Sequence, residues 1–427
     1  MTNLRIVLFI ALFLTVILPA YYFVIDDNMY YIIAQEPTLN DPNLQIETIV
    51  EGLSWPTSMA FIDNNNILVL EKEKGTVRLV SNGTLQETSV LEVDVNSRSE
   101  RGLLGIAIIN NDTVFLYYTE SSQDDDQLRN RVYKYQWNDE KRLLVNPTLI
   151  LDLPAFPGPN HDGGKLTIGP DNYLYGVIGD LNHMGKLQNV VNGPDPDDTG
   201  VIFRVNPENG SPAPDNPFIN NNNELSSLNK YYAYGIRNSF GMTFDPVTNI
   251  LWDTENGPSE YDEVNLVKPG FNSGWLQVMG PISKSGITED ELVNFPNSKY
   301  ADPVFSWLPS IGITDIEFLN SSKLGDKYAN NIFVGDIGDL TNGYLYYFEV
   351  NEDRTGMKFD SNTRSSSQTG LTDFVADNEQ EMSAISLGTD FGGITDIETG
   401  PDGFLYILTL DRESDGEGKI YKITQLL

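Results

Sequence analysis

Short apolar runs alternate with polar turns along most of the chain, and one such unit occurs six times. Each copy has an alternating apolar run, a turn rich in Asp, Asn, Pro or Gly, and a second apolar run. Period-two alternation bounded by such turns predicts antiparallel β-hairpins. The predicted hairpins pair residues 59–61 with 67–70, 106–108 with 114–118, 166–168 with 173–178, 242–244 with 250–252, 316–318 with 331–334, and 397–399 with 404–408.

The spacing of the copies predicts a closed all-β architecture. Each interval is long enough for four strands and their loops, and no long apolar helical stripe follows residue 45. Six four-stranded sheets around a central axis leave only short edges exposed. We therefore expect a six-bladed β-propeller over residues 46–427, with a strand near Ile46–Val50 completing the last blade. Two successive β-sandwiches are the alternative, and the six-fold recurrence argues against them.

The N-terminal segment departs from this pattern. Residues 6–25 form an apolar run with Arg5 before it and two aspartates after it. Its length suits a bilayer-spanning helix, and the flanking charges favour a cytoplasmic N-terminus. We expect a transmembrane helix in residues 1–25, a tether in residues 26–45, and a single-pass cell-membrane protein with an extracytoplasmic propeller. A cleaved signal segment and a secreted protein are the alternative.

Composition excludes several classes of function. The chain has 61 Asp and Glu against 27 Lys and Arg, a formal net charge of −34, which repels phosphate backbones and predicts no nucleic-acid partner. The absence of cysteine removes disulfides and thiolate sites, and two histidines are too few for a multi-histidine metal site. The acidity itself has two interpretations, namely binding of divalent cations and a solvated surface.

The loops before the third and fourth hairpins carry candidate chemistry. His161 stands beside two glycines, and an accessible imidazole suits proton abstraction near neutral pH. Arg237 and Asn238 lie between glycines and can bind carboxylate or quinone oxygens. The alternatives are a surface-loop histidine and an arginine that pairs with one of the many acids.

A third candidate segment, residues 255–265, follows the fourth hairpin. Calcium takes carboxylate and backbone carbonyl oxygens as ligands. The turn at Gly257 and Pro258 leaves carbonyls free, and the acids around it add negative charge. The segment therefore indicates an ion-binding turn, with an ordinary acidic turn as the alternative.

Together these segments resemble the glucose/sorbosone dehydrogenase family over roughly residues 50–425. Single motifs of this kind are weak, but their order and spacing are specific. The motifs are Gly102-Leu-Leu-Gly105, His161-Asp-Gly-Gly164 with Gly169-Pro-Asp171, Gly179-Asp180, Arg204 with Asp215-Asn-Pro-Phe218, residues 235–241, residues 255–265 with Gly274-Trp275, Trp307-Leu-Pro-Ser310 and Gly400-Pro-Asp-Gly403.

The resemblance implies a sugar (aldose) dehydrogenase that holds pyrroloquinoline quinone over the mouth of the propeller. It makes His161 the general base that takes the proton of the sugar hydroxyl, while hydride passes to the quinone. It makes Arg237, Asn238 and the position of Glu100 contacts of the quinone. The substrate would be a sugar or another small polyol, and the electrons would leave to an external acceptor.

The resemblance also implies calcium. The carbonyls of Gly257 and Pro258 would hold an ion that polarises a quinone carbonyl. Glu263 matches an acid that is associated with calcium in some members of the family.

Basic side chains that the family places near the three carboxylates of the quinone are missing here. An expected Arg-x-Arg-Asp element reads Gly393-Ile-Thr395-Asp396, no cation stands near Thr341, and Glu100 replaces a glutamine. Unit charges 4 Å apart interact by roughly 4 kcal/mol at an effective dielectric constant of 20, so such changes weaken anion binding. This favours a second interpretation, a non-catalytic calcium-bearing propeller that binds carbohydrate or a protein partner. A calcium-dependent hydrolase is a third.

Overall fold

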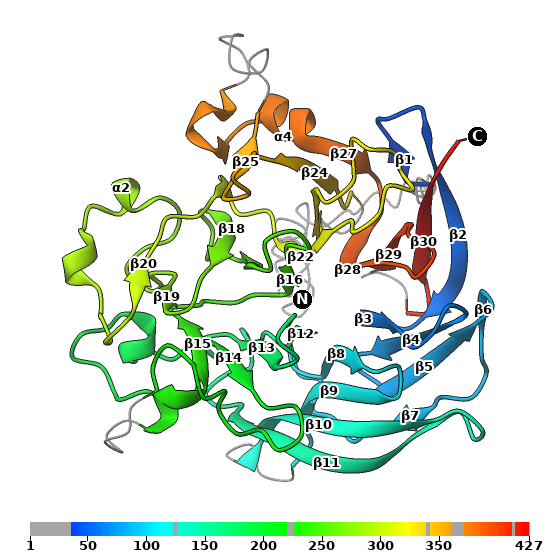
Figure 1. The fold of residues 1–427 in the computed structure, drawn as a ribbon, viewed down its shortest axis with the longest axis horizontal. Helices are drawn as coiled ribbons and strands as arrows, with labels where there is room; N and C mark the ends of the chain where they lie inside the picture. Colours follow the sequence, from blue (N-terminus) through cyan, green and yellow to red (C-terminus); the bar gives the residue numbers. More distant parts are fainter. Residues whose placement is uncertain are drawn as a thin grey trace, which may run out of the picture. The chain divides into compact units, whose positions relative to one another are not determined.

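The computed structural model describes residues 36–122, 127–219, 226–338, 342–359, 370–411 and 415–426. Residues 36–427 group into one compact unit. Within this unit, the strands of the described residues hydrogen-bond into six sheets, and each sheet contains one of the six predicted hairpins (Figure 1). One copy of the sequence repeat therefore corresponds to one sheet.

The predicted hairpins form the inner part of each sheet. They are β3 (Pro56–Phe61) with β4 (Asn66–Glu71), β8 (Leu103–Ile109) with β9 (Thr113–Glu120), β12 (Leu166–Ile168) with β13 (Leu174–Ile178), β16 (Gly241–Phe244) with β17 (Leu251–Glu255), β22 (Ile313–Phe318) with β23 (Ile332–Asp336), and β28 (Gly393–Thr399) with β29 (Leu405–Leu410).

The turns of the third and sixth copies show why the Gly-Pro-Asp sequence closes a hairpin. The carboxylate of Asp171 accepts the backbone N–H of Tyr173 at 3.1 Å and the hydroxyl of Tyr175 at 2.9 Å. In the sixth copy, Asp402 accepts the hydroxyl of Tyr406 at 3.0 Å in the same way. An aspartate that bonds to the backbone two residues on stabilises a tight turn, so the local sequence specifies each connection.

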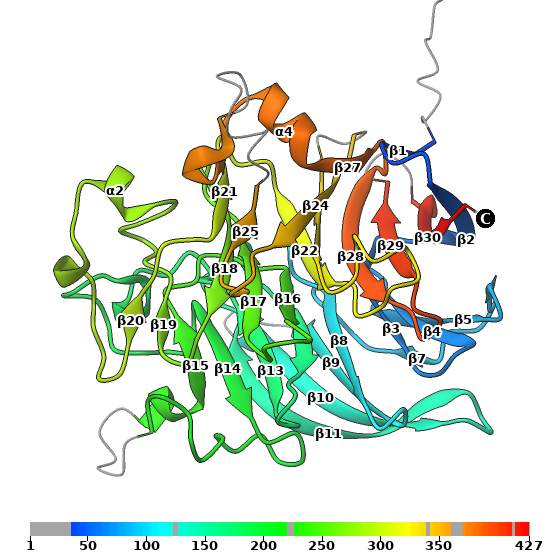
Figure 2. The same ribbon diagram turned by 45° about the horizontal axis from the view of Figure 1, so that its top comes forward.

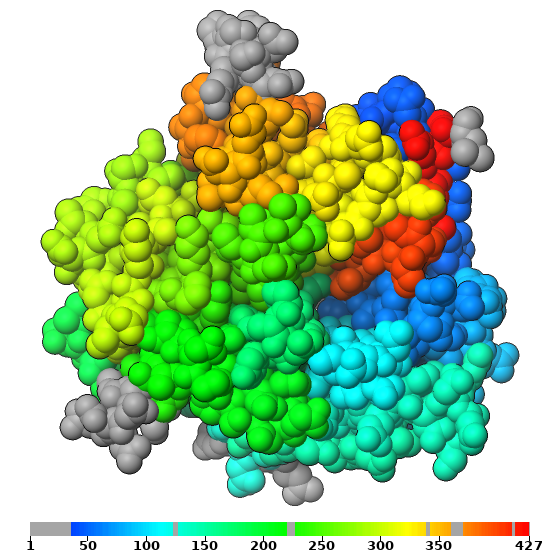
Figure 3. Space-filling view, in the orientation of Figure 1, coloured from blue at the N-terminus to red at the C-terminus, as the bar shows by residue number. Residues whose placement is uncertain are grey.

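The first strands of the six hairpins form a ring. β3, β8, β12, β16, β22 and β28 contact one another in this order, and β28 contacts β3 again. Figure 1 shows these strands around the centre, and in Figure 3 the sheets follow one another around it in sequence order. The fold is an all-β propeller, as the sequence predicted.

The ring is closed by strands from both ends of the described chain. β2 (Leu44–Leu53) pairs antiparallel with β30 (Gly418–Gln425), and the sheet runs β2-β30-β29-β28 (Figure 2). The prediction of a closing strand near Ile46–Val50 is therefore confirmed. Hydrogen bonds and packing hold this closure, since the chain has no cysteine for a disulfide.

Outer strands and short helices complete the unit. The strands are β1 (Thr38–Leu39), β5 (Thr76–Ser81), β6 (Thr84–Leu85), β7 (Leu91–Glu92), β10 (Arg129–Asn138), β11 (Leu143–Pro154), β14 (Val201–Val205), β15 (Tyr231–Tyr234), β18 (Asp262–Val267), β19 (Phe271–Asn272), β20 (Lys299–Tyr300), β21 (Phe305–Trp307), β24 (Leu345–Val350), β25 (Met357–Lys358), β26 (Val375–Ala376) and β27 (Ser386–Thr389). The helices are α2 (Ile282–Ser285) and α4 (Glu379–Ile385), with 3-10 turns at Lys186–Gln188, Ser226–Lys230, Glu289–Glu291 and Leu371–Asp373.

The hydrophobic core lies between neighbouring sheets. Six apolar clusters each join one sheet to the next around the ring. Between the fourth and fifth sheets, for example, the fully buried Trp252 packs edge-on against Phe318 with ring centres 5.7 Å apart. Because the apolar faces are used between sheets, the strand ends and loops at the axis are free to carry polar side chains.

The expected membrane anchor is not supported by the structure. The α-helices of the described residues, α2 and α4, have four and seven residues, whereas a membrane span needs about 20. No helix in this part of the chain is long and apolar enough to cross a membrane. This finding corrects the predicted transmembrane helix and the single-pass localisation at the cell membrane. Residues 6–25, on which that prediction rested, lie outside the described residues.

Candidate functional site

A cavity of about 700 Å³ lies where the inner strands and their connecting loops meet. This volume is within the range of small-molecule sites. Strands or connecting loops of all six sheets contribute to the lining, so the cavity lies at the ring's shared axis. The surface of the cavity is mostly apolar, with threonine, serine and asparagine side chains set among the apolar ones.

The structure brings most of the candidate residues together at this cavity. Its lining includes the predicted base, the two predicted quinone contacts of the fourth loop, the acid two residues before the Gly-Leu-Leu motif, and the first residue of the calcium turn. These are His161, Arg237, Asn238, Glu100 and Gly257. Pro258 is exposed beyond the lining, and Glu263 is buried behind it.

His161 occupies a constrained loop position at the cavity. Its φ of 65° lies in the left-handed region, which is uncommon for a residue with a side chain. The loop packs closely against the Gly-Leu-Leu-Gly motif. A Cβ at Gly105 would lie only 1.9 Å from the carbonyl oxygen of Gly164, so only glycine allows this approach. Two motifs of the family pattern therefore meet through their glycines, and this contact places His161.

The ring of His161 is oriented by Asp180. Nδ1 lies 2.6 Å from Oδ1 of Asp180, and Oδ2 of the same carboxylate accepts the indole N–H of Trp275 at 2.6 Å. An ionised carboxylate can only accept hydrogen bonds, so Nδ1 of His161 carries the hydrogen that it donates to Asp180. Nε2 then keeps its lone pair, and no hydrogen-bond partner for it is found among the described residues. The arrangement therefore suits a general base at the cavity.

Glu100 joins the base to the neighbouring loop. Its Oε2 accepts the backbone N–H of His161 at 2.8 Å and the side-chain amide of Asn238 at 2.9 Å. The amide oxygen of Asn238 in turn accepts the N–H of Gly163 at 3.2 Å. Glu100 thus holds two lining residues in place, and it is also the only acid of the described cavity lining.

Arg237 presents a guanidinium at the cavity, and no carboxylate of the described residues forms an ion pair with it. Nη1 donates to the carbonyl of Asn256 at 2.8 Å, and the guanidinium carbon lies 5.3 Å from the centre of the Trp275 ring. Nε is buried and has no partner among the described atoms. Burial lowers the pKa of Arg237, against the opposing effect of nearby acids such as Asp180. Within the described part of the chain, this side chain therefore has no counter-ion in direct contact, unlike most buried cations.

The turn at Gly257 needs a glycine and is fixed by an acid. A Cβ at Gly257 would lie 1.9 Å from the carbonyl oxygen of Tyr261, so no larger residue fits. Asp262 accepts the N–H of Gly257 at 2.9 Å, and its other oxygen accepts the N–H of Gly312 at 2.7 Å. Asp262 therefore ties the turn to the loop that precedes β22.

Glu263 lies on the other side of the same strand. It is buried, its Oε1 accepts the N–H of Gly280, and the amide of Asn265 donates to its Oε2 at 3.3 Å. Burial, and then the carboxylate of Glu255 on the paired strand, raise the pKa of Glu263 well above its ordinary value.

Among the described residues, no group of three or more His, Asp and Glu side chains could hold a metal ion.

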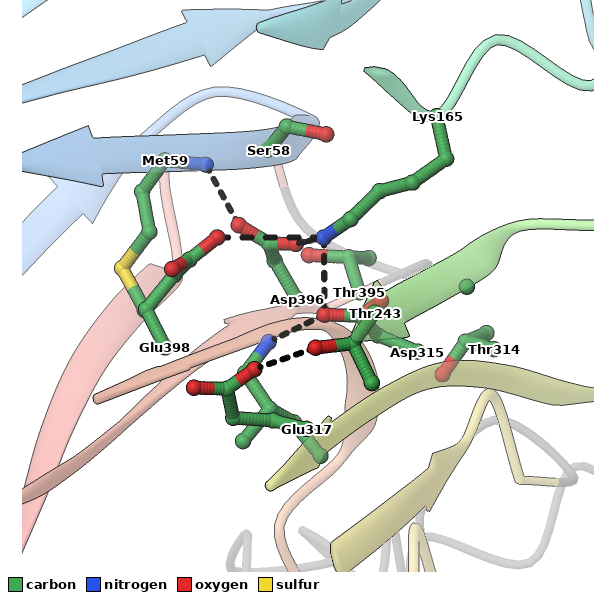
Figure 4. A network of polar contacts seen from close by, with 12 residues as sticks. Ser58, Met59, Lys165, Thr243, Thr314, Asp315, Glu317, Thr395, Asp396 and Glu398 are labelled. Atoms are coloured by element: carbon green, nitrogen blue, oxygen red, sulfur yellow. Dashed lines mark hydrogen bonds and ion pairs between the residues drawn. The ribbon is translucent and has the colours of Figure 1, made fainter. Parts of the chain in front are cut away.

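Lys165 lines the cavity but is already neutralised. Its ammonium lies 2.9 Å from Asp315 and 2.5 Å from Asp396, and Glu398 is 3.8 Å away (Figure 4). Burial opposes the charged form, but the carboxylates of Asp315 and Asp396 outweigh it and raise the pKa of Lys165 well above its ordinary value. Lys165 therefore joins the third, fifth and sixth sheets at the axis.

The expected basic elements are absent where the structure describes those positions. Thr395 lines the cavity with a neutral hydroxyl, and Gly393 and Ile394 precede it at the start of β28. Thr341 lies outside the described residues. The positive charge of the lining comes instead from Lys72, Lys165 and Arg237.

Sequence reasoning gave no role to Asp180, Trp275, Lys72 or Lys165. Asp180 could have been found, because it follows the run 174–178 in the hairpin entered through the His161 loop, and ends of paired strands meet. Lys165 follows His161 in the same loop, and Trp275 contacts Asp180 without being part of the described lining. Lys72 comes from the first sheet, far from the His161 loop in sequence, and no local pattern brings it to the cavity.

Comparison with known proteins gives consistent relatives. The family model for glucose / sorbosone dehydrogenase matches residues 53–422. The chain is 27% identical over 386 residues to the aldose sugar dehydrogenase YliI of Escherichia coli (strain K12), covering 88% of this chain and 91% of that protein. It is 29% identical over 270 residues to quinoprotein glucose dehydrogenase B of Acinetobacter calcoaceticus, covering 57% of this chain and 55% of that protein.

Solved structures agree. A putative oxidoreductase (glucose dehydrogenase) from Thermus thermophilus is similar with a TM-score of 0.66 and 26% identity, covering 89% of this chain and 99% of that chain. The PQQ-bound form of an aldose sugar dehydrogenase from Streptomyces coelicolor shares the fold, with a TM-score of 0.65, 22% identity, and 91% and 98% of the two chains covered.

Proposed function

Because this chain belongs to the glucose/sorbosone dehydrogenase family, we propose that it oxidises an aldose or another small polyol with pyrroloquinoline quinone and calcium. The named relatives are sugar dehydrogenases, which are oxidoreductases. The observation that carries the proposal is the pair of His161 and Asp180, 2.6 Å apart, at a cavity large enough for a cofactor and a sugar.

The lining fits a carboxylated quinone. The guanidinium of Arg237 lies at the cavity without a carboxylate, and its buried Nε has no partner among the described atoms. Arg237 and Asn238 would hold the quinone, and the carbonyls of Gly257 and Pro258 would hold calcium, a cation that prefers oxygen ligands. When bound, the quinone supplies an acceptor for the hydride of the sugar carbon.

The residues of this chain would manage the proton. Nε2 of His161 takes the proton of the sugar hydroxyl, and Asp180 stabilises the imidazolium that results. Oε2 of Glu100 accepts from both the backbone N–H of His161 and the side-chain amide of Asn238, and so fixes the positions of these two residues relative to each other. An external electron acceptor completes the proposed reaction.

A second candidate is a calcium-bearing propeller without redox chemistry that binds carbohydrate or a protein partner. The neutral Thr395 in the lining and the acid at Glu100 favour it, because both reduce the attraction for an anionic quinone. The arrangement of His161 and Asp180 favours the enzyme, since a binding protein needs no oriented base.

Dye reduction by the purified full-length chain tests the proposal. The assay contains calcium and pyrroloquinoline quinone, with a panel of aldoses as substrates. We expect turnover that His161→Ala lowers by about 10²–10⁴-fold, the contribution typical of a positioned base. His183→Ala is the matched control, because His183 is the only other histidine and is not in the cavity lining.

Quinone binding measured by calorimetry separates the two candidates. The dehydrogenase requires that the wild type and His161→Ala both bind the quinone, with turnover lost only in the variant. A wild type that binds calcium and carbohydrate but no quinone would establish the binding protein instead.

A further inference from the structure

The charge of the cavity lining is opposite to that of the chain. The whole chain has 61 acidic and 27 basic residues, yet the described lining contains three cations, Lys72, Lys165 and Arg237, and one acid, Glu100. A concave site with charge opposite to the surrounding protein favours ligands of the complementary sign. The lining therefore indicates an anionic ligand.

Two of the three cations are available to such a ligand. Lys165 is neutralised by Asp315 and Asp396, whereas Lys72 and Arg237 have no carboxylate within 4 Å among the described residues. Nζ of Lys72 has one long contact, 3.4 Å to the carbonyl of Ser97. Both cations can therefore donate to a ligand oxygen without breaking an ion pair.

The backbone of Lys72 is held firmly at the cavity. Its N–H donates to Trp55 at 3.0 Å, and its carbonyl accepts the N–H of Leu103 from the next sheet at 3.1 Å. The side-chain stem packs on Gly102, where a Cβ would lie 2.6 Å from Cγ of Lys72. The lysine is thus positioned by the same Gly-Leu-Leu-Gly segment that packs against the His161 loop.

The two free cations reach the cavity from different sides. Lys72 follows β4 in the first sheet, and Arg237 lies in the loop that joins the third sheet to the fourth. The first sheet is not a neighbour of the third or the fourth sheet in the ring. Burial lowers the pKa of each cation. An anion beside them would offset that desolvation cost.

We propose that Lys72 is a ligand-binding residue of this cavity and that it acts with Arg237 to bind carboxylate groups. The inference rests on the proposed function when the carboxylates belong to the quinone. The same chemistry could come from an acidic sugar, and a ligand with two separated carboxylates engages both cations. Lys72 supplies positive charge that Gly393 and Thr395 do not.

Calorimetry on the full-length chain tests this proposal with two probes. Pyrroloquinoline quinone with calcium is the first, and glucuronate, compared with neutral glucose, is the second. We expect Lys72→Met to weaken binding of the carboxylate probe at least tenfold, about 1.4 kcal/mol, and Lys72→Arg to restore most of it. Lys74→Met is the matched control, because this lysine is half-exposed on the same turn. Thermal unfolding checks that each variant is folded.

The outcomes distinguish this inference from the proposed function. If the wild type binds quinone and oxidises sugar while Lys72→Met binds within twofold of it, the inference falls and the proposed function stands. If the wild type binds glucuronate but no quinone, and Lys72→Met weakens that binding, the inference stands and the proposed function falls. If the wild type binds neither carboxylate probe, both are overturned.

Discussion

Oδ1 of Asp180 lies 2.6 Å from Nδ1 of His161, at the end of the hairpin that the histidine loop enters. The same oxygen accepts the backbone N–H of Asn182 at 2.7 Å, and Oδ2 accepts the indole of Trp275. With three N–H donors in its own surroundings, the carboxylate is held in one orientation. It therefore fixes both the direction of the imidazole and the nitrogen that carries the hydrogen.

Replacement of Asp180 by asparagine tests this orientation. The amide would offer a donor to Nδ1 and favour the tautomer with hydrogen on Nε2, which cannot take a proton. We expect kcat for sugar oxidation to fall by about 10²-fold or more, while the Kd of the quinone changes less than about threefold. Steady-state kinetics and calorimetry measure the two quantities.

The pH profile distinguishes positioning from simple structural damage. A positioning role predicts that Asp180→Asn changes the pH dependence of kcat, because the base no longer has its partner. The exposed Asp195, which pairs with Lys186 on the surface, provides the matched control Asp195→Asn, with wild-type kinetics expected. Equal kcat values in wild type and Asp180→Asn would refute the role.

Glu100→Gln is expected to tighten binding of the quinone. Glu100 is the only acid in the described lining, and a glutamine oxygen can still accept the N–H groups of His161 and Asn238. Removal of one negative charge beside an anionic ligand should lower its Kd by about three- to tenfold at low salt. Calorimetry at 50 mM and 500 mM salt measures this, and the gain should shrink at the higher salt because ions screen the interaction. Weaker binding at both salt concentrations would show that the carboxylate itself is needed.

Lys165→Met is expected to destabilise the fold. The variant leaves Asp315 and Asp396 buried without their cation, and breaking a buried ion pair from one side costs about 3–5 kcal/mol. Burial raises the pKa of Asp315, so protonation should relieve part of this cost as the pH falls. Urea unfolding at pH 8 and pH 5 should show the larger loss at pH 8.

The double variant Lys165→Met/Asp315→Asn serves as the control for that interpretation. Because it removes a buried charge together with its partner, it should recover part of the free energy of unfolding at pH 8. If the free energy of unfolding does not recover, the destabilisation comes instead from the lost packing of the lysine side chain.

The fold was predictable because its signals are local. Alternation of apolar residues and Asp-containing turns specified all six hairpins, and the turns at Asp171 and Asp402 show the contacts that make the pattern work. The strand near Ile46–Val50 was predictable because the ring needs a last partner. The membrane assignment failed because it extended a hydropathy argument from residues 6–25 to the localisation of the protein.

The site was predictable only in part. Glycine-flanked loops identified His161 and Arg237, since backbone that approaches closely at the axis requires glycine. The family resemblance associated Glu263 with calcium. Glu263 follows Asp262 in β18, and neighbouring strand residues face opposite sides. Asp262 therefore supports the turn, and Glu263 points into the interior. Lys72 escaped notice because its exposure to the cavity depends on contacts between sheets.

Stability should decrease from pH 5 to pH 8, and Asp336 should contribute to this slope. Burial raises the pKa of Asp336 to about 7, from an ordinary value of 3.8. A group whose pKa is raised on folding stabilises the protein fully below the unfolded value and loses that contribution as the pH rises through the folded value. The loss is up to about 1.4 kcal/mol per pH unit for one group.

Asp336→Asn imitates the protonated form, since an amide can still accept from the N–H of Tyr344 and bond to the hydroxyl of Tyr346. Urea unfolding at several pH values should give a flatter profile for this variant, whereas Asp290→Asn, at an exposed position, should keep the wild-type slope. An unchanged slope in Asp336→Asn would mean that this carboxyl is ionised in the folded protein throughout the range.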